Sequence, residues 1–528
     1  MANPVQPKQP ETSYALKAVI DVGSTSIRMA VAQVLDNGRY ATLDSLHQSV
    51  AIGSDTFTRG SISRSTIKEA VKVLRSFSTV LKEYNIDLQR DVRAVATSAV
   101  REARNRDEFL DRIYMATGIL VEVIEGTEVN RLTFLGIRSL LEREAPLREH
   151  RLLVIEVGGG STELLGLDDG SVSFAHTYRL GSYRLRENLD AIEVSGGRQT
   201  EMLDAEIDAG VRQFHDAVGK TGPGDTLLLL LGGEARLAAR LIIGTWDTAS
   251  LARLKLKDLT RLATQVAAQD IEELVRRYRL SFEDAQALGP ALMIYVKLAK
   301  SFGLRQVCVC GITLRDGLLA EAATGSAWSE DFVRQIFHSV KEVGKKYHLD
   351  EAHAKCVTDI ALSMFRALRD EHRLDYRYEV ILTVAAQLHD VGMFVSTSSH
   401  HKHSQYIIKN SDIFGLGQKD IMLTALVARY HRRALPRPTH LDYESLTREE
   451  RLVVNKLAAI LRAADALDRS HTQAIRNVRI SMSEEEVVLQ TGHEGDFSAE
   501  KRALAAKGKM FEQVYGRKVI LRTKRKKG

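Results

Sequence analysis

Cysteine is scarce in this chain, with three among 528 residues, at Cys308, Cys310 and Cys356. So few thiols exclude a fold held together by a framework of disulfides, and they are typical of a reducing compartment. We therefore expect a cytoplasmic protein. Cys308 and Cys310 alternate within an apolar run, which predicts two buried thiols in preference to a metal-binding pair.

Long hydrophobic runs and a strong charge of one sign are also missing. No apolar stretch reaches membrane-spanning length and the N-terminus has no signal-peptide pattern, so we expect no membrane association. The 74 Lys and Arg residues only slightly exceed the 68 Asp and Glu residues. The resulting net charge of +6 suits a polyanionic ligand without requiring one. The basic end, residues 524–527, is typical of a solubilising terminus, and we expect no nucleic-acid partner.

What the chain does have is a glycine-rich hairpin pattern at residues 152–165, LLVIEVGGGSTELL. A buried strand ends at Glu156, three glycines and two hydroxyl residues follow, and Glu163 comes next. Glycines let backbone N–H groups approach an anion closely, and flanking acids can hold a divalent cation through its waters. The pattern therefore predicts a metal–phosphate cradle, although a tight hairpin with incidental acids has the same pattern.

A second stretch of the same kind occurs near the N-terminus, where residues 18–34 read AVIDVGSTSIRMAVAQV. An apolar strand again ends in an acid, Asp21, followed by Gly23, the hydroxyl residues Ser24 and Thr25, and another strand. Two such hairpins, one in each half of a region of roughly 300 residues, predict a duplicated fold whose halves grip one phosphate chain across a cleft.

Ordered motifs along nearly the whole chain resemble one family. They are DVGSTS at Asp21, ATSAVREARN at residues 96–105, IEGTEVNRL at 124–132, EVGGGSTEL at Glu156, RLGSYRL at Arg179, CGITLRDGLL at Cys310, and LHDVG…HHKHS…RYHRR…LRAADALDRS in the C-terminal half. Together they resemble the exopolyphosphatase / guanosine pentaphosphate phosphohydrolase (Ppx/GppA) family, with a C-terminal HD domain.

The resemblance implies an α/β fold with two duplicated lobes, like actin, sugar kinases and ribonuclease H. We expect lobe I at residues 14–145 and lobe II at 146–324, then an all-α HD-type domain at 325–476. A small α/β domain at 477–523 should contain one helix at 498–515. Residues 1–13 are expected to form a disordered tail, and residues 524–528 a flexible basic one.

For the cleft, the resemblance implies Mg²⁺ and a set of phosphate-contacting groups. The expected phosphate-binding residues are Asp21, Gly23, Ser24, Thr25, Arg101, Gly158, Gly159, Gly160, Ser161 and Gly233. Arg101 is included because a guanidinium fork suits a pair of phosphate oxygens. The carboxylates of Asp21, Glu156 and Glu163 are the candidates for binding Mg²⁺ or orienting water.

The catalytic base is where this sequence departs from the family. The family has a glutamate two residues before an arginine, and aligning Arg131 with that arginine puts Val129 in the glutamate's place. Glu128 is adjacent, but one residue is about 100° around a helix. Smaller departures are Glu156 for an aspartate, Thr25 for an asparagine, and the stretch from Glu234 to Arg236. The catalytic candidates are therefore Glu163, Glu156 and Glu128.

The helical half carries a second set of chemistry-bearing residues. Imidazoles and carboxylates in this order suit Mn, Fe, Zn or, with waters, Mg. By resemblance to HD phosphohydrolases, the implied metal ligands are His353, His389, Asp390 and Asp465, with His403 and His431 as additional ligands or phosphate contacts.

The sequence thus favours a phosphohydrolase that acts in the cleft on inorganic polyphosphate or guanosine pentaphosphate and forms a homodimer. Two alternatives stay open. One is a catalytically weakened regulator that binds polyphosphate or an alarmone. The other is a metal-dependent nucleotide phosphohydrolase whose active site is the HD domain.

The substitution Val129→Glu tests the first alternative. If another carboxylate already serves as the base, as the hydrolase interpretation requires, restoring the family glutamate should change phosphate release from polyphosphate by less than about threefold. Loss of a base typically costs roughly 10²–10⁴ in rate. A gain of that size in the variant would instead favour the regulator.

Overall fold

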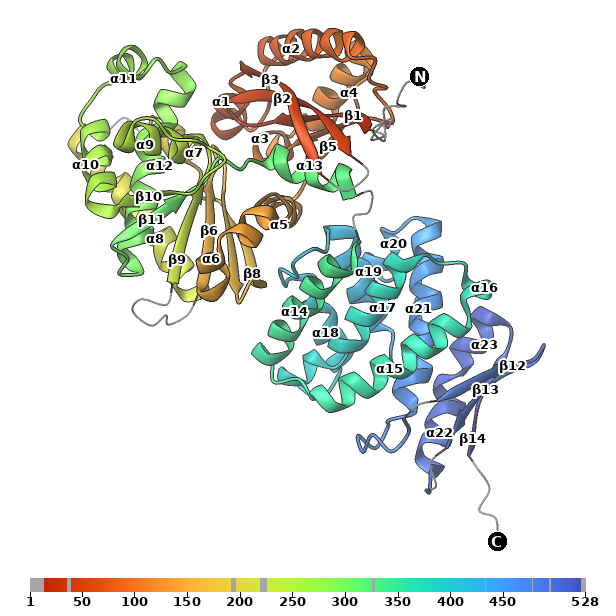
Figure 1. Ribbon diagram of the computed structural model, residues 1–528. Helices are drawn as coiled ribbons and strands as arrows, with labels where there is room; N and C mark the ends of the chain where they lie inside the picture. The colour runs from red at the N-terminus through yellow and green to blue at the C-terminus, as the bar shows by residue number, and fades with distance from the viewer. Residues whose placement is uncertain are drawn as a thin grey trace, which may run out of the picture. The chain divides into compact units, whose positions relative to one another are not determined.

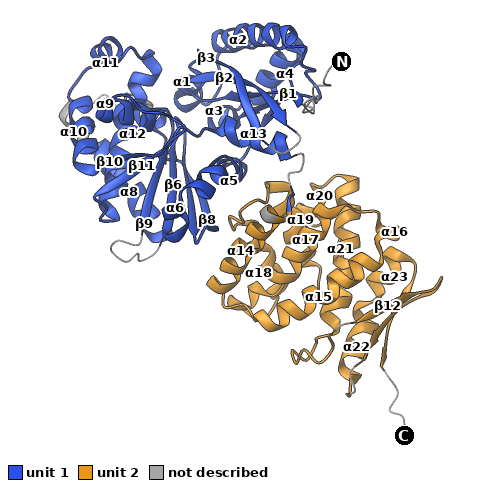
Figure 2. Ribbon diagram, viewed as in Figure 1, with its two compact units in different colours: residues 1–329 blue, residues 330–528 orange. Residues whose placement is uncertain are grey.

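The computed structural model describes residues 14–35, 39–190, 196–218, 226–324, 328–432, 434–476, 478–492 and 495–523. It divides into two compact units, residues 1–329 and residues 330–528 (Figure 2). The expected tails, 1–13 and 524–528, lie outside the described residues. The finer domain boundaries expected from the sequence stay predictions.

Unit 1 begins with a five-stranded sheet in the order β3-β2-β1-β4-β5. Strands β1, β2 and β3 form an antiparallel meander, and β4 and β5 continue the sheet in parallel. The bounds are β1 (Tyr14–Val22), β2 (Ser26–Leu35), β3 (Tyr40–Ser49), β4 (Val92–Ala96) and β5 (Val121–Val123). The first expected hairpin is therefore the β1–β2 turn, as its alternation of strand, glycine and strand predicts.

The second sheet of unit 1 repeats this scheme, in the order β10-β11-β9-β6-β7-β8. Strands β6, β7 and β8 form the antiparallel meander, and β9 and β11 extend it in parallel. The bounds are β6 (Arg151–Val157), β7 (Thr162–Asp168), β8 (Ser171–Tyr178), β9 (Thr226–Leu231), β10 (Ala252–Lys255) and β11 (Gln306–Val309). The matching strand order shows the predicted duplication directly (Figure 1).

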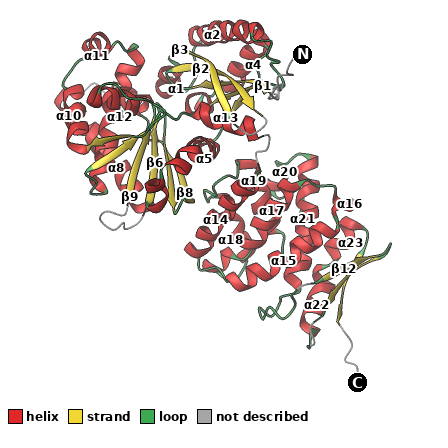
Figure 3. Cartoon of the chain, viewed as in Figure 1, coloured by secondary structure: helices red, strands yellow, loops and turns green. Residues whose placement is uncertain are grey.

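Helices cover both sheets (Figure 3). The long amphipathic helix α2 begins after Ser63, whose side chain accepts from the backbone N–H of Thr66. The helices of unit 1 are α1 (Ile52–Arg59), α2 (Arg64–Glu83), α3 (Ser98–Glu102), α4 (Arg106–Thr117), α5 (Gly126–Arg143), α6 (Ala145–Glu149), α7 (Ser182–Asp190), α8 (Gly196–Val218), α9 (Gly233–Ile243), α10 (Leu256–Ala267), α11 (Ile271–Tyr278), α12 (Phe282–Ser301) and α13 (Leu314–Thr324).

Helix α13 packs on β1 and β2 although it follows the last strand of the second sheet. Its Leu318 and Leu319 lie in one buried cluster with Val19 and Ala30 of the first sheet. It also packs closely on α5: a Cβ built on Gly317 would lie 2.1 Å from the carbonyl oxygen of Leu132. This close approach fixes α13 against lobe I.

Unit 2 is helical up to Ala466 and ends in a sheet of order β12-β13-β14. Its elements are α14 (Glu330–Lys346), α15 (Glu351–Ala367), α16 (Arg369–His372), α17 (Tyr376–Leu388), η1 (Val391–Phe394), α18 (His400–Lys409), α19 (Gln418–Arg429), α20 (Leu441–Glu444), α21 (Arg448–Ala466), β12 (Arg479–Met482), β13 (Glu486–Thr491), α22 (Ser498–Lys507), α23 (Lys509–Tyr515) and β14 (Lys518–Thr523).

The expected single helix at 498–515 is wrong, because the structure divides it at Gly508. A Cβ on Gly508 would lie 2.7 Å from the carbonyl oxygen of Leu504 and 2.8 Å from a methyl group of Val519 on β14. Helical periodicity continues on both sides, so the sequence pattern alone did not reveal the break.

Two sequence expectations about apolar residues can be compared with the structure. Cys308 and Cys310 are buried free thiols, as predicted, and Cys356 is a third buried free thiol. Among the described residues, no helix is both long and apolar enough to cross a membrane. The cytoplasmic location stays a prediction.

The substitution Gly317→Ala should destabilise unit 1 by roughly 1–3 kcal/mol or more, because the added methyl group would overlap backbone of α5 that cannot rotate away. The control is Gly289→Ala in α12, where the nearest atom to an added Cβ is 3.8 Å away. We expect this control to stay within about 1 kcal/mol of the wild type. Calorimetric melting of both variants is the measurement, and equal melting temperatures would contradict the packing described.

Candidate functional site: a hairpin junction and a histidine–aspartate cluster

The glycine turns of the two lobes meet in unit 1, and we call residues 23–25 and 158–161 the hairpin junction. A Cβ on Gly159 would lie 2.8 Å from the Cβ of Ser24, and one on Gly160 would lie 2.5 Å from the hydroxyl of Ser98. The two lobes can approach this closely only because both positions lack a side chain. The expectation that the two hairpins face each other is therefore met in the geometry.

The backbone of the junction suits an anion. The turns close on themselves, with Gly23 donating to the carbonyl of Ser26 (3.0 Å) and Gly158 to that of Ser161 (2.8 Å). Within the described part of the chain, the N–H groups of Ser24, Thr25, Gly159 and Gly160 donate no hydrogen bond. Successive free N–H groups of this kind form anion-binding concavities, here one from each lobe.

Carboxylates crowd the same junction. Burial, together with the neighbouring Glu163 and Asp21, raises the pKa of Glu156 to about 7 against the opposing pull of Arg236 and Arg28. The side chain of Glu156 stays half-buried, so water reaches it. Crowded like charges with raised pKa values mark a place where a cation or a proton is favoured.

Glu163, the strand partner of Glu156, and Arg101 also lie at the junction. The hydroxyl of Ser161 donates to Glu163 Oε1 at 2.6 Å. Burial still raises the pKa of Glu163, although this hydrogen bond and the charge of Arg101 act in the opposite direction. Arg101 donates to the carbonyl of Ile124 at 2.6 Å, which holds its guanidinium near the carboxylate. The structure thus brings the expected Arg101 to the junction.

The sequence analysis gave no binding role to three arginines near the acids, Arg28, Arg236 and Arg315. Arg28 Nη1 lies 3.9 Å from Asp21 Oδ2. Arg236 follows Gly233, which is exposed and has no atom within 4 Å of where its Cβ would be. Burial and the neighbouring Arg28 and Arg236 lower the pKa of Arg315, although Asp21 acts in the opposite direction. In the sequence, only the departure from the family pattern at Glu234–Arg236 indicated that extra charge lies near the junction.

The structure argues against Glu128 as the catalytic base. Arg131 donates a hydrogen bond to each carboxylate oxygen of Glu128, both at 2.7 Å. Arg93 donates a third hydrogen bond to Glu128 at 3.1 Å. Burial alone would raise the pKa of Glu128, but these arginines lower it. Val129 lies in a buried apolar cluster between α5 and the first sheet. Glu128 is therefore held in an ion pair with Arg131, and Val129, which replaces the family glutamate, is buried.

In unit 2, four of the expected metal ligands converge on one point. The Nε2 atoms of His353 and His389 lie 3.8 and 3.9 Å from Asp465 Oδ1, and each is 3.8 Å from Asp390 Oδ2. All four side chains are buried. Neither Nε2 atom has a hydrogen-bond partner within the described residues, which fits imidazole nitrogens placed for a divalent metal.

A second group shares Asp390. Its Oδ1 lies 3.2 Å from His400 Nε2 and 3.4 Å from His431 Nε2. Asp390 thus directs one oxygen to each group, an arrangement that suits two ions bridged by a carboxylate. His431 was expected at the site, but the expected His403 belongs to neither group among the described residues.

His400 takes the place that the sequence analysis gave to His403. Gly392 packs against the backbone of α18, with its would-be Cβ 2.2 Å from the carbonyl oxygen of His400, and donates its N–H to Ser404. His400 and Ser404 are one turn apart on this buried face, whereas His403 is only half-buried. A sequence with histidines at 400, 401 and 403 does not show which one faces inward.

The charges of this cluster are strongly coupled. Burial would raise the pKa of Asp390, but the imidazoles of His389, His431 and His400 hold it well below its usual range. Burial and the neighbouring His389 lower the pKa of His431 to about 3. Ionised carboxylates and a neutral imidazole are the forms that bind metal.

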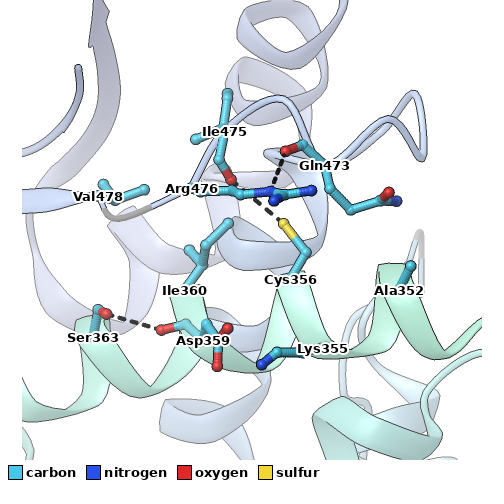
Figure 4. Close-up of a pocket in the computed structure, with 10 residues that line it drawn as sticks. All are labelled: Ala352, Lys355, Cys356, Asp359, Ile360, Ser363, Gln473, Ile475, Arg476 and Val478. Carbon is cyan, nitrogen blue, oxygen red and sulfur yellow. Dashed lines mark hydrogen bonds between the residues drawn. The ribbon is translucent and has the colours of Figure 1, made fainter. Parts of the chain in front are cut away.

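A supporting layer orients His353. Asp468 Oδ2 lies 2.8 Å from His353 Nδ1, and the backbone N–H of Gln473 donates to Asp468 Oδ1 at 2.7 Å. Gln473 has a φ of 49°, in the left-handed region that costs energy for such a residue. It also lines a pocket of about 270 Å³ between α15 and the segment before β12, where Arg476 donates to its carbonyl (Figure 4).

Comparisons with known proteins bear on both units. The model of the Ppx/GppA phosphatase family matches residues 30–324, and that of domain III of the Ppx/GppA phosphatases matches residues 333–507. A guanosine-5'-triphosphate,3'-diphosphate pyrophosphatase of Aliivibrio fischeri is 25% identical over 465 residues, 85% of this chain and 87% of that protein. A crystal structure of an exopolyphosphatase from Cytophaga hutchinsonii, 23% identical, covers 59% of this chain and 98% of its own with a TM-score of 0.53. The crystal structure of an exopolyphosphatase-like protein, 24% identical, has a TM-score of 0.52 and also covers 59% of this chain and 98% of its own.

The fold defines a two-lobed, actin-like α/β protein with a helical C-terminal unit that ends in a small sheet, which confirms the expected fold class. The chain belongs to the Ppx/GppA phosphatase family. The expected reaction class, hydrolysis of phosphoanhydride bonds, is confirmed at the level of this family.

The histidine cluster predicts metal binding that calorimetry can measure. With Mn²⁺ as the titrant, His389→Ala should weaken binding at least tenfold, because outer-shell changes alone cost roughly 10- to 100-fold and this group would be a direct ligand. His400→Ala should remove one binding event and leave another. The matched control, His403→Ala, should bind like the wild type. Loss of binding in the control with retention in His400→Ala would contradict the assignment.

Proposed function

We propose that the hairpin junction of unit 1 hydrolyses phosphoanhydride bonds, with inorganic polyphosphate or guanosine pentaphosphate as the substrate. The observation that carries the proposal is the meeting of the two glycine turns, which presents unpaired N–H groups from both lobes. The exopolyphosphatase and guanosine pentaphosphate pyrophosphatase named above support the substrate class. The expected homodimer stays a prediction.

The donor set at the junction fits Mg²⁺. Among the described residues, no three carboxylates of the junction offer oxygens within 4.8 Å of one another. Mg²⁺ usually takes one or two protein carboxylates and completes its shell with waters and substrate phosphates. Asp21 and Glu163 would supply those oxygens, and the ion would neutralise charge on the phosphoryl group.

Glu156 is the residue placed to take the proton from the attacking water. A general base works best when its pKa lies near the working pH, and burial with Glu163 and Asp21 raises the pKa of Glu156 to about 7. Its side chain is one methylene longer than the aspartate of the family, and Val129 is apolar and cannot take a proton. Arg101 and the free N–H groups of the turns would hold the phosphate in line.

The pH profile of kcat/KM tests this role. A base must be deprotonated, so kcat/KM for phosphate release should rise with pH, change slope near pH 7 and level off above it. Glu156→Gln should lower the plateau by roughly 10²–10⁴-fold and remove that slope. If Glu156→Gln kept both rate and profile, another group would be the base. Tight binding of polyphosphate by the wild type with no phosphate release would instead establish the regulator interpretation.

A second candidate function belongs to unit 2, because the unpartnered Nε2 atoms of His353 and His389 favour a metal-dependent phosphohydrolase there. Pairs of metal ions held by histidines and carboxylates activate water and bind phosphate oxygens. His389→Ala separates the two sites: it should abolish Mn²⁺-dependent hydrolysis of nucleotides while sparing phosphate release from polyphosphate. Glu156→Gln should show the reverse pattern.

A further inference from the structure

The histidine–aspartate cluster includes a cation from the last part of the chain, Lys507 at the end of α22. Its ammonium forms an ion pair with Asp465 Oδ2. The other oxygen of the same carboxylate, Oδ1, faces the Nε2 atoms of His353 and His389. Asp465 therefore divides its two oxygens between the metal-binding group and the lysine.

The position of Lys507 is fixed by its surroundings. Arg462, a buried side chain on α21, donates through Nε to the carbonyl of Lys507 and through Nη1 to those of Tyr430 and Ala434. The next residue is Gly508, which separates α22 from α23 and where an added Cβ would contact Leu504 and Val519. The lysine side chain is mostly buried and extends towards Asp465.

We propose that Lys507 is a phosphate-binding residue of the unit 2 metal site, where it pairs with Asp465 until metal and a phosphate ligand bind. The inference deepens the second proposed function and rests on it. A divalent ion at Oδ1 would repel the ammonium and share the charge of Asp465, which weakens the ion pair. A phosphate oxygen on that ion offers the ammonium a new, fully charged partner.

Charge balance supports this assignment. The three carboxylates that face the imidazoles, Asp390, Asp465 and Asp468, carry three negative charges, which one divalent ion and Lys507 together balance. A second ion at Asp390, His400 and His431 would leave the site positive, and a ligand of two or three negative charges would then balance it. In this arrangement the sheet-bearing end of the chain completes the site.

Calorimetry on the full chain tests the inference in two titrations, first with Mn²⁺ and then with inorganic phosphate added to the Mn²⁺-loaded protein. Lys507→Met should bind Mn²⁺ more tightly, because a nearby positive charge is gone. It should bind phosphate about 10- to 100-fold more weakly, since a charged hydrogen bond is lost. Lys507→Arg keeps the charge and should keep phosphate affinity within about threefold.

The matched control is Lys509→Met, which makes the same substitution at an exposed residue two positions later and should change neither titration. If Lys507→Met unfolds, Lys507→Gln supplies a neutral variant that can still donate to Asp465. No Mn²⁺ binding by the wild type would overturn the metal site and this inference with it. Mn²⁺ binding with phosphate affinity unchanged in the neutral variants, or weaker Mn²⁺ binding as their only effect, would overturn this inference alone.

Discussion

Contact between two turns without side chains is the constraint on which unit 1 depends. Gly159 and Gly160 let the second lobe reach Ser24 and Ser98 of the first, and a methyl group at either glycine would overlap them. Because the turns meet, the strands behind them deliver Asp21, Glu156 and Glu163 to one place. Burial, and after it the crowding with Glu163 and Asp21, raises the pKa of Glu156. Position, charge and proton affinity at the junction therefore share a single geometric cause.

Much of this arrangement could be predicted from local patterns. An apolar strand, an acid, glycines and hydroxyls in succession define a hairpin wherever they occur, so both turns and the duplicated sheets were predictable. The ordered set His353, His389, Asp390 and Asp465 was predicted from the resemblance to HD phosphohydrolases. What local patterns cannot give is direction around a helix. Glu128 is held by Arg93 of β4 as well as by Arg131 of its own helix, and His400 faces inward in place of His403, where Gly392 packs against the backbone of α18.

Partners supplied by remote elements were equally hidden. Lys507 lies 42 positions after Asp465, and Arg236 lies 80 positions after Glu156. Neither pairing has a sequence signature, because each depends on how sheets and helices stack. The division of the helix at Gly508 shows the same limit, since Gly508 lies against Val519 of β14, and an added Cβ would contact it.

The two units also solve the problem of concentrated negative charge differently. The junction keeps three acids near arginines and raises the pKa of one of them, Glu156, to about 7. In the cluster of unit 2, imidazoles surround Asp390 and the ammonium of Lys507 pairs with Asp465. These neighbours lower the pKa of both carboxylates, so both stay ionised. A proton-accepting acid suits chemistry on water, and fixed anions suit metal ions. The same residue types thus favour different tasks in the two units.

Helix α13 has a consequence for how the chain folds during synthesis. Its leucines cover apolar surface on β1 and β2, strands made about 290 residues earlier. A nascent chain therefore carries the first sheet with an uncovered face until the second sheet is complete. The first lobe therefore leaves the ribosome with part of its apolar surface exposed. That surface is protected from aggregation only after the second lobe and α13 have been translated.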